Sequence, residues 1–340
     1  MKNISILSID LAKNVFQLHG INRQGKTVFK KRLYRSRLKE LIANLPPCLI
    51  AMEACIGAHA WARQFKALGH QVKLIAPQYV KPFVRVNKND MRDAEAIALA
   101  ASLPSTPSVS IKSEEQLDLQ AIHRVRERLV REKTAIGNEL RGLLADMGIV
   151  IPTGYASLRV LIPELLEDAE QPLTFRGRQL IADLREQWLE KEAHIARYDQ
   201  ILQDYVKESE DCQKLLDIPG IGPINASLLL SYLGDAKRFA SARHFAASLG
   251  LVPRQSSSGG KERLLGISKQ GNSHVRKQLV HGARAAYRVL LKEDAKGRLS
   301  EWAKRMQASG KHANKIVVAL ANKLARIVWC MMIKERGYVA

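Results

Sequence analysis

The sequence predicts an α/β domain followed by an all-α region, and three patterns support this fold class. Residues 4–77 alternate short β-rich runs with amphipathic stretches, which is typical of a mixed sheet flanked by helices. Residues 114–147 and 175–209 each carry apolar side chains every seven residues, which predicts two long helices. The C-terminal third has short apolar helices around a Pro-Gly-Ile-Gly-Pro turn. The expected domains are residues 1–110, 111–210 and 211–340.

The N-terminal domain is expected to begin with an antiparallel meander, because three β-rich runs are separated by Asn14 and by a turn at residues 22–25. Helices and strands then alternate, with one helix ending at Gly69 and the strand after it stopped by Pro77. The expected order is β-β-β-α-β-α-β-α. The three β-rich runs are residues 4–10, 15–21 and 26–34. The elements that follow are a helix at 36–45, a strand at 48–53, a helix at 58–69, a strand at 71–77 and a helix from residue 90.

The middle domain is expected to be a coiled-coil arm, because two heptad seams face each other across a Pro- and Gly-containing loop. Its first helix also carries many basic residues, which could clamp nucleic acid or mediate subunit pairing; a plain solvated helix face is an equal alternative. The seams are Ile122, Leu129, Ile136 and Leu143, and Ile181, Trp188, Ile195 and Leu202; the basic residues are Arg124, Arg126, Arg128, Arg131, Lys133 and Arg141.

The C-terminal domain opens with a helix-hairpin-helix pattern around Gly220 and Gly222. In such a motif the glycine turn and a helix N-terminus offer backbone N–H groups to a DNA phosphate without reading sequence. The alternative is a tight turn between core helices.

Charge points to a nucleic-acid partner. The 340 residues include 54 Lys or Arg and 33 Asp or Glu, which gives a net charge of +21. Residues 251–340 hold 19 basic and 5 acidic residues, so this region is expected to lie against phosphate. A solvated, solubilising surface is the alternative.

A cytoplasmic protein that does not span a membrane is expected. The four cysteines form no CxxC pair and no zinc spacing, and the N-terminus has no secretory pattern. The apolar stretch 315–333 contains Lys323 and Arg326, which are costly inside a bilayer and favour a buried amphipathic helix.

Four acidic residues are predicted to form a metal site, although the first 110 residues hold only six acids. Asp10 and Glu53 each end a strand, and Asp90 and Asp93 lie one helical turn apart. Four close carboxylates repel one another unless a cation binds, and their oxygens suit Mg²⁺ or Mn²⁺. Two such ions clamp the attacking and leaving oxygens of a phosphodiester. Helix capping by Asp90 is the compatible alternative.

Five stretches together resemble the DEDD transposases of insertion sequences, the bridge-RNA-guided recombinases. The resemblance covers about residues 3–335. It implies a RuvC-like, ribonuclease-H-type fold for the N-terminal domain and a transposase domain with a catalytic serine at the C-terminus. The stretches are SIDLAKNVFQLHG, AMEACIGAHAWARQFKALGHQVKLIAPQYVKPF, KNDMRDAEAIA, LLDIPGIGPINASLLLSYLGD and GLVPRQSSSGGKERLLGISKQGNSHVRKQLV.

The resemblance also implies an activity and its residues. The enzyme would cut and rejoin donor and target DNA through a phosphoserine link, guided by a noncoding RNA and working as a dimer or tetramer. The DEDD tetrad falls on Asp10, Glu53, Asp90 and Asp93. The nucleophile is assigned to Ser258, before Gly259, with Ser257 as the fallback. Nucleic-acid contacts are expected from Gly220, Gly222, Arg254, Lys261, Arg263, Lys269 and Arg276.

Two other functions compete with this one. A metal-dependent RuvC-like junction resolvase or nuclease would use water and would not need Ser258. A non-enzymatic nucleic-acid scaffold would not need the acids. On composition alone, the Ser-Gly run is typical of a flexible linker; the basic sequence that follows and the resemblance favour the nucleophile.

Overall fold

The computed structural model describes residues 3–84, 90–257 and 262–338. It divides into two compact units, Met1–Glu114 and Glu115–Ala340. The expected division into three domains remains a prediction.

The first unit contains a six-stranded mixed sheet of order β3-β2-β1-β4-β5-β6. The meander β1–β2–β3 is antiparallel, as predicted, whereas β1–β4 and β4–β5 pair in parallel. The short edge strand β6, antiparallel to β5, was not predicted. The strands are β1 (Ile6–Asp10), β2 (Val15–Ile21), β3 (Thr27–Tyr34), β4 (Leu49–Glu53), β5 (Gln71–Ile75) and β6 (Ser108–Val109).

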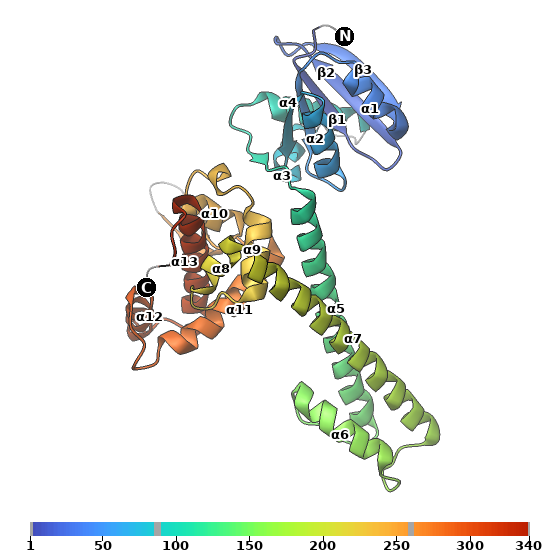
Figure 1. Cartoon of the computed structure of the whole chain (residues 1–340), viewed down its shortest axis with the longest axis vertical. Helices are drawn as coiled ribbons and strands as arrows, with labels where there is room; N and C mark the ends of the chain where they lie inside the picture. The colour runs from blue at the N-terminus through green and yellow to red at the C-terminus, as the bar shows by residue number, and fades with distance from the viewer. Residues whose placement is uncertain (1–2, 85–89, 258–261, 339–340) are drawn as a thin grey trace. The chain divides into compact units, whose positions relative to one another are not determined.

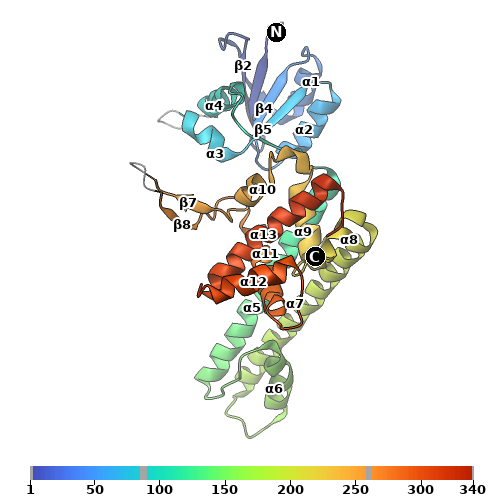
Figure 2. The ribbon, with the colours of Figure 1, turned by 90° about the vertical axis from the view of Figure 1, so that its left-hand side faces the viewer.

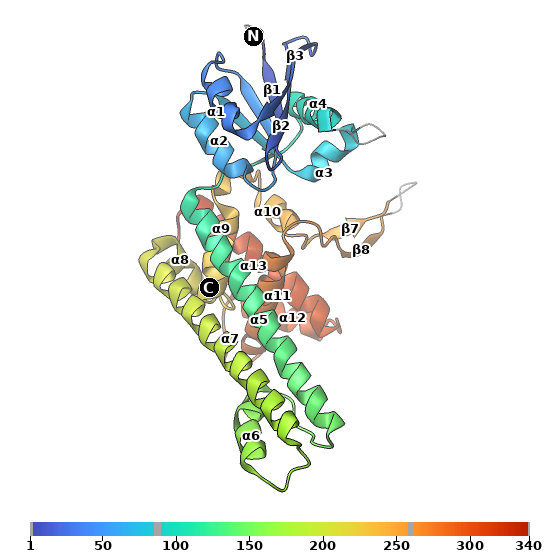
Figure 3. The same cartoon turned by 90° about the vertical axis from the view of Figure 1, so that its right-hand side faces the viewer.

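Helices cover both faces of this sheet (Figure 2; Figure 3). On one face, α1 and α2 bury Leu38, Ile42, Trp61 and Phe65 against apolar strand residues. On the other face, the alanine-rich α4 packs on the sheet. The helical elements are α1 (Arg35–Ala43), α2 (Ala58–Ala67), α3 (Pro77–Val80), the 3₁₀ turn η1 (Lys81–Phe83) and α4 (Asp90–Ser102). The mixed α/β prediction is therefore confirmed for this unit.

Two long helices, α5 (Glu114–Asp146) and α7 (Phe175–Glu208), occupy the predicted stretches. With α6 (Tyr155–Glu167) they enclose an apolar cluster that includes Leu140, Ile162 and Trp188 (Figure 1). A coiled coil in the strict sense remains a prediction.

The rest of the second unit is built mainly of helices around one core. The sequence did not predict its β-hairpin, β7–β8, which extends from the helices in Figure 3. Its elements are α8 (Glu210–Leu216), α9 (Pro223–Leu233), the 3₁₀ turn η2 (Ala236–Arg238), α10 (Ala242–Ser248), β7 (Pro253–Gln255), β8 (Leu264–Ile267), α11 (Ser273–Leu290), α12 (Arg298–Ala308) and α13 (Ala313–Lys334).

Helix α13 is long and apolar enough to cross a membrane by length and composition alone. One side of it, including Ile316, Leu320, Leu324 and Val328, is fully buried in the core of the second unit. These contacts agree with the predicted buried amphipathic helix.

Candidate active site and nucleic-acid surfaces

Asp10 and Glu53 end neighbouring strands and belong to the same face of the sheet. Strands β1 and β4 are parallel, and Ile9 pairs with Met52, so the next residues along each strand are the two acids. Side chains alternate between the faces of a strand. Ile6 and Ala51 pack on the α4 side, and Asp10 and Glu53 follow them at even spacing. Both carboxylates therefore belong to the face that α4 covers.

Helix α4 brings Asp93 to this face. Ala96, Ile97, Ala100 and Ala101 pack on the sheet, and Asp93 lies one turn before them on the same helical stripe. Asp93 is in the first turn of α4, where a negative charge also favours the helix dipole. The capping interpretation and the metal interpretation are thus compatible at this residue.

A buried hydrogen bond fixes α4 against β1. The Ser8 hydroxyl lies 2.6 Å from the Ala94 carbonyl oxygen and 3.0 Å from that of His19, and it donates its one proton to one of them at a time. Ser8 is fully buried. Ala94 adjoins Asp93, and Ser8 lies two residues before Asp10. The contact between Ser8 and Ala94 therefore holds Asp93 near Asp10. Ser8 was not predicted from the sequence, where its one signal is a small polar residue inside an apolar strand.

The carboxylates interact electrostatically. Burial raises the pKa of Glu53, and the negative charge of Asp93 raises it further. The Cys55 thiol also has a raised pKa, caused first by burial and then by the charges of Glu53 and Asp10. The charge of Asp93 therefore reaches Glu53, and the charges of Glu53 and Asp10 both reach the Cys55 thiol, so the three carboxylates lie in one neighbourhood.

The donor set suits a hard divalent cation, because it consists of carboxylate oxygens on one face of a sheet. Among the residues whose side chains are described, no three His, Cys, Asp or Glu lie close enough together to hold a metal ion. The side chain of Asp90, the first residue of α4, lies outside that description. The full tetrad, including Asp90, remains a prediction.

The predicted phosphate-binding turn contains two glycines in different surroundings. Gly220 has a φ of +87°, and a Cβ built on it would lie 2.4 Å from the Gly282 carbonyl oxygen of α11. Gly222 has a φ of −95° and is the exposed N-cap of α9, with nothing within 4 Å of a built Cβ. Packing against Gly282 therefore explains Gly220, and only Gly222 presents open backbone to a ligand. Gly282 is a further residue that the sequence analysis missed.

The two glycines give a matched pair of variants. We expect Gly220→Ala to destabilise the protein by about 2–4 kcal/mol, because a Cβ there adds left-handed strain and displaces α11. Gly222→Ala should leave the melting temperature nearly unchanged and weaken DNA binding only if this turn holds phosphate. Thermal unfolding followed by circular dichroism checks the first expectation, and equal melting temperatures for both variants would contradict it.

The predicted nucleic-acid residues of the C-terminal domain differ in accessibility. Arg254, Arg263 and Lys269 are exposed on and beside the β7–β8 hairpin. Arg276 donates to the Leu249 carbonyl oxygen at 2.9 Å, so part of its guanidinium holds the chain within this unit. Lys261 lies outside the described residues. Their contacts with nucleic acid remain predictions.

The first two serines of the run, Ser256 and Ser257, directly follow β7. The Ser256 N–H donates to the Arg263 carbonyl oxygen at 2.9 Å, and Ser257 accepts a hydrogen bond from the Gln255 side-chain amide at 3.0 Å. Both serines are exposed. Ser258, the predicted nucleophile, lies outside the described residues. Ser256 therefore pairs with the residue before β8. The nucleophile and the linker interpretations of the run both remain predictions.

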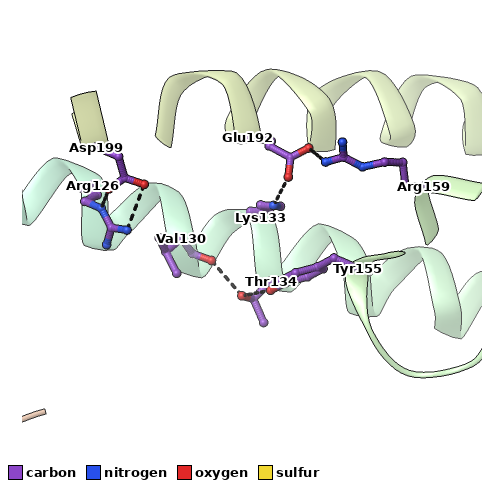
Figure 4. Close-up of polar contacts among 8 residues, drawn as sticks. All are labelled: Arg126, Val130, Lys133, Thr134, Tyr155, Arg159, Glu192 and Asp199. Carbon is purple, nitrogen blue, oxygen red and sulfur yellow. Dashed lines mark hydrogen bonds and ion pairs between the residues drawn. The ribbon is translucent and has the colours of Figure 1, made fainter. Parts of the chain in front are cut away.

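Much of the basic face of α5 is used within the second unit (Figure 4). Arg126 pairs with Asp199, and Lys133 lies 2.6 Å from Glu192, both on α7. Elsewhere on the helix, Arg128 pairs with Glu132, and Arg141 donates to the Gly137 carbonyl oxygen. These four basic residues therefore stabilise the helices. If α5 clamps nucleic acid, Arg124 and Arg131 are the predicted basic residues that remain to do so.

Buried polar contacts that the sequence did not reveal also join α5 to α9. His123 lies 3.1 Å from the Ser227 hydroxyl, which itself donates to the Pro223 carbonyl oxygen. Burial, with smaller contributions from the neighbouring His274 and Arg126, lowers the pKa of His123 to about 3. The imidazole is therefore neutral at physiological pH, and its Nε2–H donates to the serine. This arrangement orients α9, whose N-terminus carries the predicted phosphate turn.

A mixed sheet with acids on one face, followed by a basic helical unit, is consistent with a ribonuclease-H-like enzyme that acts on nucleic-acid backbones. Sequence comparisons define the class further. Residues 7–149 match a family of DEDD type described as transposase, and residues 212–298 match "Transposase IS116/IS110/IS902 family".

Relatives extend over nearly the whole chain. A probable family 20 transposase of Pseudomonas aeruginosa is 45% identical over 99% of both chains. The transposase for insertion sequence element IS1328 of Yersinia enterocolitica is 44% identical over 97% of both. The transposase for IS1111A of Coxiella burnetii is 42% identical over 99% of this chain and 92% of its own. This chain belongs to the IS110 family of insertion-sequence transposases, enzymes that cut and rejoin DNA.

Proposed function

We propose that this transposase cuts and rejoins DNA through a covalent phosphoserine intermediate on Ser258, with a metal site formed by Asp10, Glu53, Asp90 and Asp93. A noncoding bridge RNA would pair with donor and target DNA and supply sequence specificity. The observation that carries the proposal is the shared face of Asp10, Glu53 and Asp93 on adjacent elements, where their charges interact.

The acids would hold Mg²⁺ or Mn²⁺, which when bound polarises the phosphodiester and neutralises charge at the reacting phosphate. Strands β1 and β4 hold Asp10 and Glu53 on a rigid sheet, and Ser8 holds the start of α4 beside them. Fixed carboxylates lose little freedom on binding a cation, so the geometry is set before DNA arrives.

The serine supplies the chemistry of rejoining. Its Oγ would attack phosphorus, forming an Oγ–P bond as one P–O bond of the DNA breaks and the freed DNA oxygen takes a proton. Arg254 and Arg263, exposed beside the serine run, would stabilise negative charge on the phosphoryl oxygens. The phosphoserine link conserves the energy of the broken bond, so a DNA hydroxyl can reverse the step without ATP.

Subunit pairing is part of the proposal. Tetrad and serine lie about 165 positions apart, on two separate compact units of the chain. We propose that one subunit contributes the acids and another the serine within a dimer or tetramer, with the α5–α7 arm as the pairing element and the helix-hairpin-helix turn at Gly222 as a backbone contact to DNA phosphate.

The test uses purified protein, its guide RNA, cognate DNA and Mg²⁺, with the products separated on a denaturing gel. We expect a protein–DNA adduct that runs above the free strands and that disappears when a chelator replaces Mg²⁺. Metal-dependent cleavage without any adduct would favour water as nucleophile and would refute the phosphoserine step. Adduct formation that survives chelation would refute the metal site.

A further inference from the structure

A hollow on the second unit, distinct from the acids and the serine run, is lined by basic residues. It has a volume of about 540 Å³ and lies between α13, the start of α12 and the chain that follows α13. None of its lining residues is acidic. Its five cationic residues are Arg298, Lys323, Arg326, Lys334 and Arg336.

These cations carry uncompensated charge. Within the described parts of the chain, none of the five forms an ion pair with an acid. The Lys323 ammonium lies 5.3 Å from the centre of the Trp302 ring, a contact that leaves its positive charge in place. Like charges around one hollow repel one another, so a bound anion would stabilise this part of the unit.

The hollow is built on a core helix, which carries three of its five cations. Lys323, Arg326 and Lys334 recur at helical spacing on one side of α13. The adjoining side of the helix, with Leu320, Leu324 and Val328, is fully buried. The packed helix therefore fixes the backbone positions of these three cations and keeps them near one another for binding phosphates.

The remaining lining is apolar and aromatic. Leu299, Ile327 and Met331 line the hollow, and Tyr338 adds a half-buried ring whose pKa is raised by burial. Cations alone would suit any phosphate, including the outside of a duplex, whose bases are stacked away from the protein. Among nucleic-acid ligands, an apolar lining with an aromatic ring favours one that offers an unstacked base.

We propose that this hollow binds a single strand of nucleic acid, with one unpaired base against Tyr338 and the adjoining phosphates on Arg326, Lys334 and their basic neighbours. The occupant is a strand end, loop or displaced strand of DNA or RNA. The inference depends on the chain being a transposase. It does not depend on the tetrad or on Ser258.

The first test measures binding of fluorescein-labelled dT20, U20 and a 30-base-pair duplex to the full chain by fluorescence anisotropy over a range of salt concentrations. Arg326→Ala/Lys334→Ala should weaken strand binding about tenfold or more and reduce the slope of log K against log[salt] by about 1.4, since each phosphate contact on a single strand contributes about 0.7. Lys292→Ala/Lys296→Ala, on the exposed α11–α12 connection and outside the hollow, is the matched control.

The second test separates base contact from phosphate contact. Tyr338→Ala should weaken binding of dT20 or U20 by about tenfold and leave duplex binding unchanged, whereas Tyr338→Phe, which keeps the ring, should bind like the wild type. A larger effect on U20 than on dT20 identifies RNA as the occupant, and the reverse identifies DNA.

Two outcomes would overturn the proposal: unchanged strand affinity and salt slope in Arg326→Ala/Lys334→Ala, or a loss confined to duplex. Circular dichroism of each variant shows that it is folded. Strand binding needs neither metal nor cleavage, so a failure here is distinguishable from a failure of the proposed chemistry.

Discussion

Replacing Ser258 with alanine is expected to abolish the covalent protein–DNA adduct and to reduce strand cleavage by more than about 10³-fold. Removing the nucleophile of an enzyme that forms a covalent intermediate leaves only binding and electrostatic stabilisation, and losses of this size or larger follow. The same denaturing gel that detects the wild-type adduct measures the loss. Ser258→Ala should still bind DNA and guide RNA, because the substitution removes one hydroxyl and no charge.

Ser257→Ala is the matched control. The Ser257 hydroxyl accepts a hydrogen bond from the Gln255 side chain at 3.0 Å next to the end of β7, so its loss should cost a local contact and leave the adduct in place. If the adduct persists in Ser258→Ala and disappears in Ser257→Ala, the nucleophile is one residue earlier than proposed. Cleavage at the wild-type rate in both variants would point to water.

The sheet of the first unit could be predicted because its strands carry strong local signals. Runs such as residues 15–21 and 48–53 are apolar and bounded by turn residues, and the boundaries of β2 and β4 in the structure lie within a residue of the prediction. Strand β6 was missed because it has two residues, too few for a pattern. The β7–β8 hairpin was missed because its exposed strands of three and four residues flank a serine- and glycine-rich run that composition identifies as a linker.

Only part of the candidate site could be predicted from the sequence. The adjacency of Asp10 and Glu53 was conditional on their strands being neighbours, and the parallel β1–β4 pairing meets that condition. The contact that positions α4, from Ser8 to the Ala94 carbonyl oxygen, joins residues 86 positions apart and has no local signature. Long-range packing decides such contacts, so a single sequence does not show them.

The roles of individual basic residues and glycines were also not predictable from the sequence. Net charge correctly indicated a nucleic-acid partner, yet it does not separate Arg126, which is paired with Asp199, from Arg254, which is exposed. The glycines of the predicted phosphate turn look equivalent in sequence. Only the approach of α11 shows that Gly220 is required for packing while Gly222 is open. Residue type gives the chemistry that is possible, and tertiary packing decides which residues remain available for it.

Substitution of Asp93 by asparagine is expected to reduce strand cleavage by more than about 100-fold without destabilising the protein. Loss of a group that supports a metal ligand already costs 10–100-fold in many enzymes, and loss of the ligand itself should cost more. Stability should change little, because the lost attraction between Asp93 and the helix dipole is offset by relief of the repulsion that raises the pKa of Glu53. The variant should also lose part of the rise in melting temperature that Mg²⁺ gives the wild type.

Glu95→Gln is the control that separates the loss of a metal ligand from the loss of one negative charge on α4. Glu95 also lies on α4, but its charge acts on His19 of β2, whose pKa it raises against the larger lowering effect of burial. Both variants remove one negative charge within the same turn, so the loss of general helix charge is equal. Near wild-type cleavage in Glu95→Gln with loss in Asp93→Asn would place the metal on the face shared with Asp10 and Glu53. Equal strand cleavage in the two variants would show that Asp93 is not part of the site and would refute the proposed tetrad.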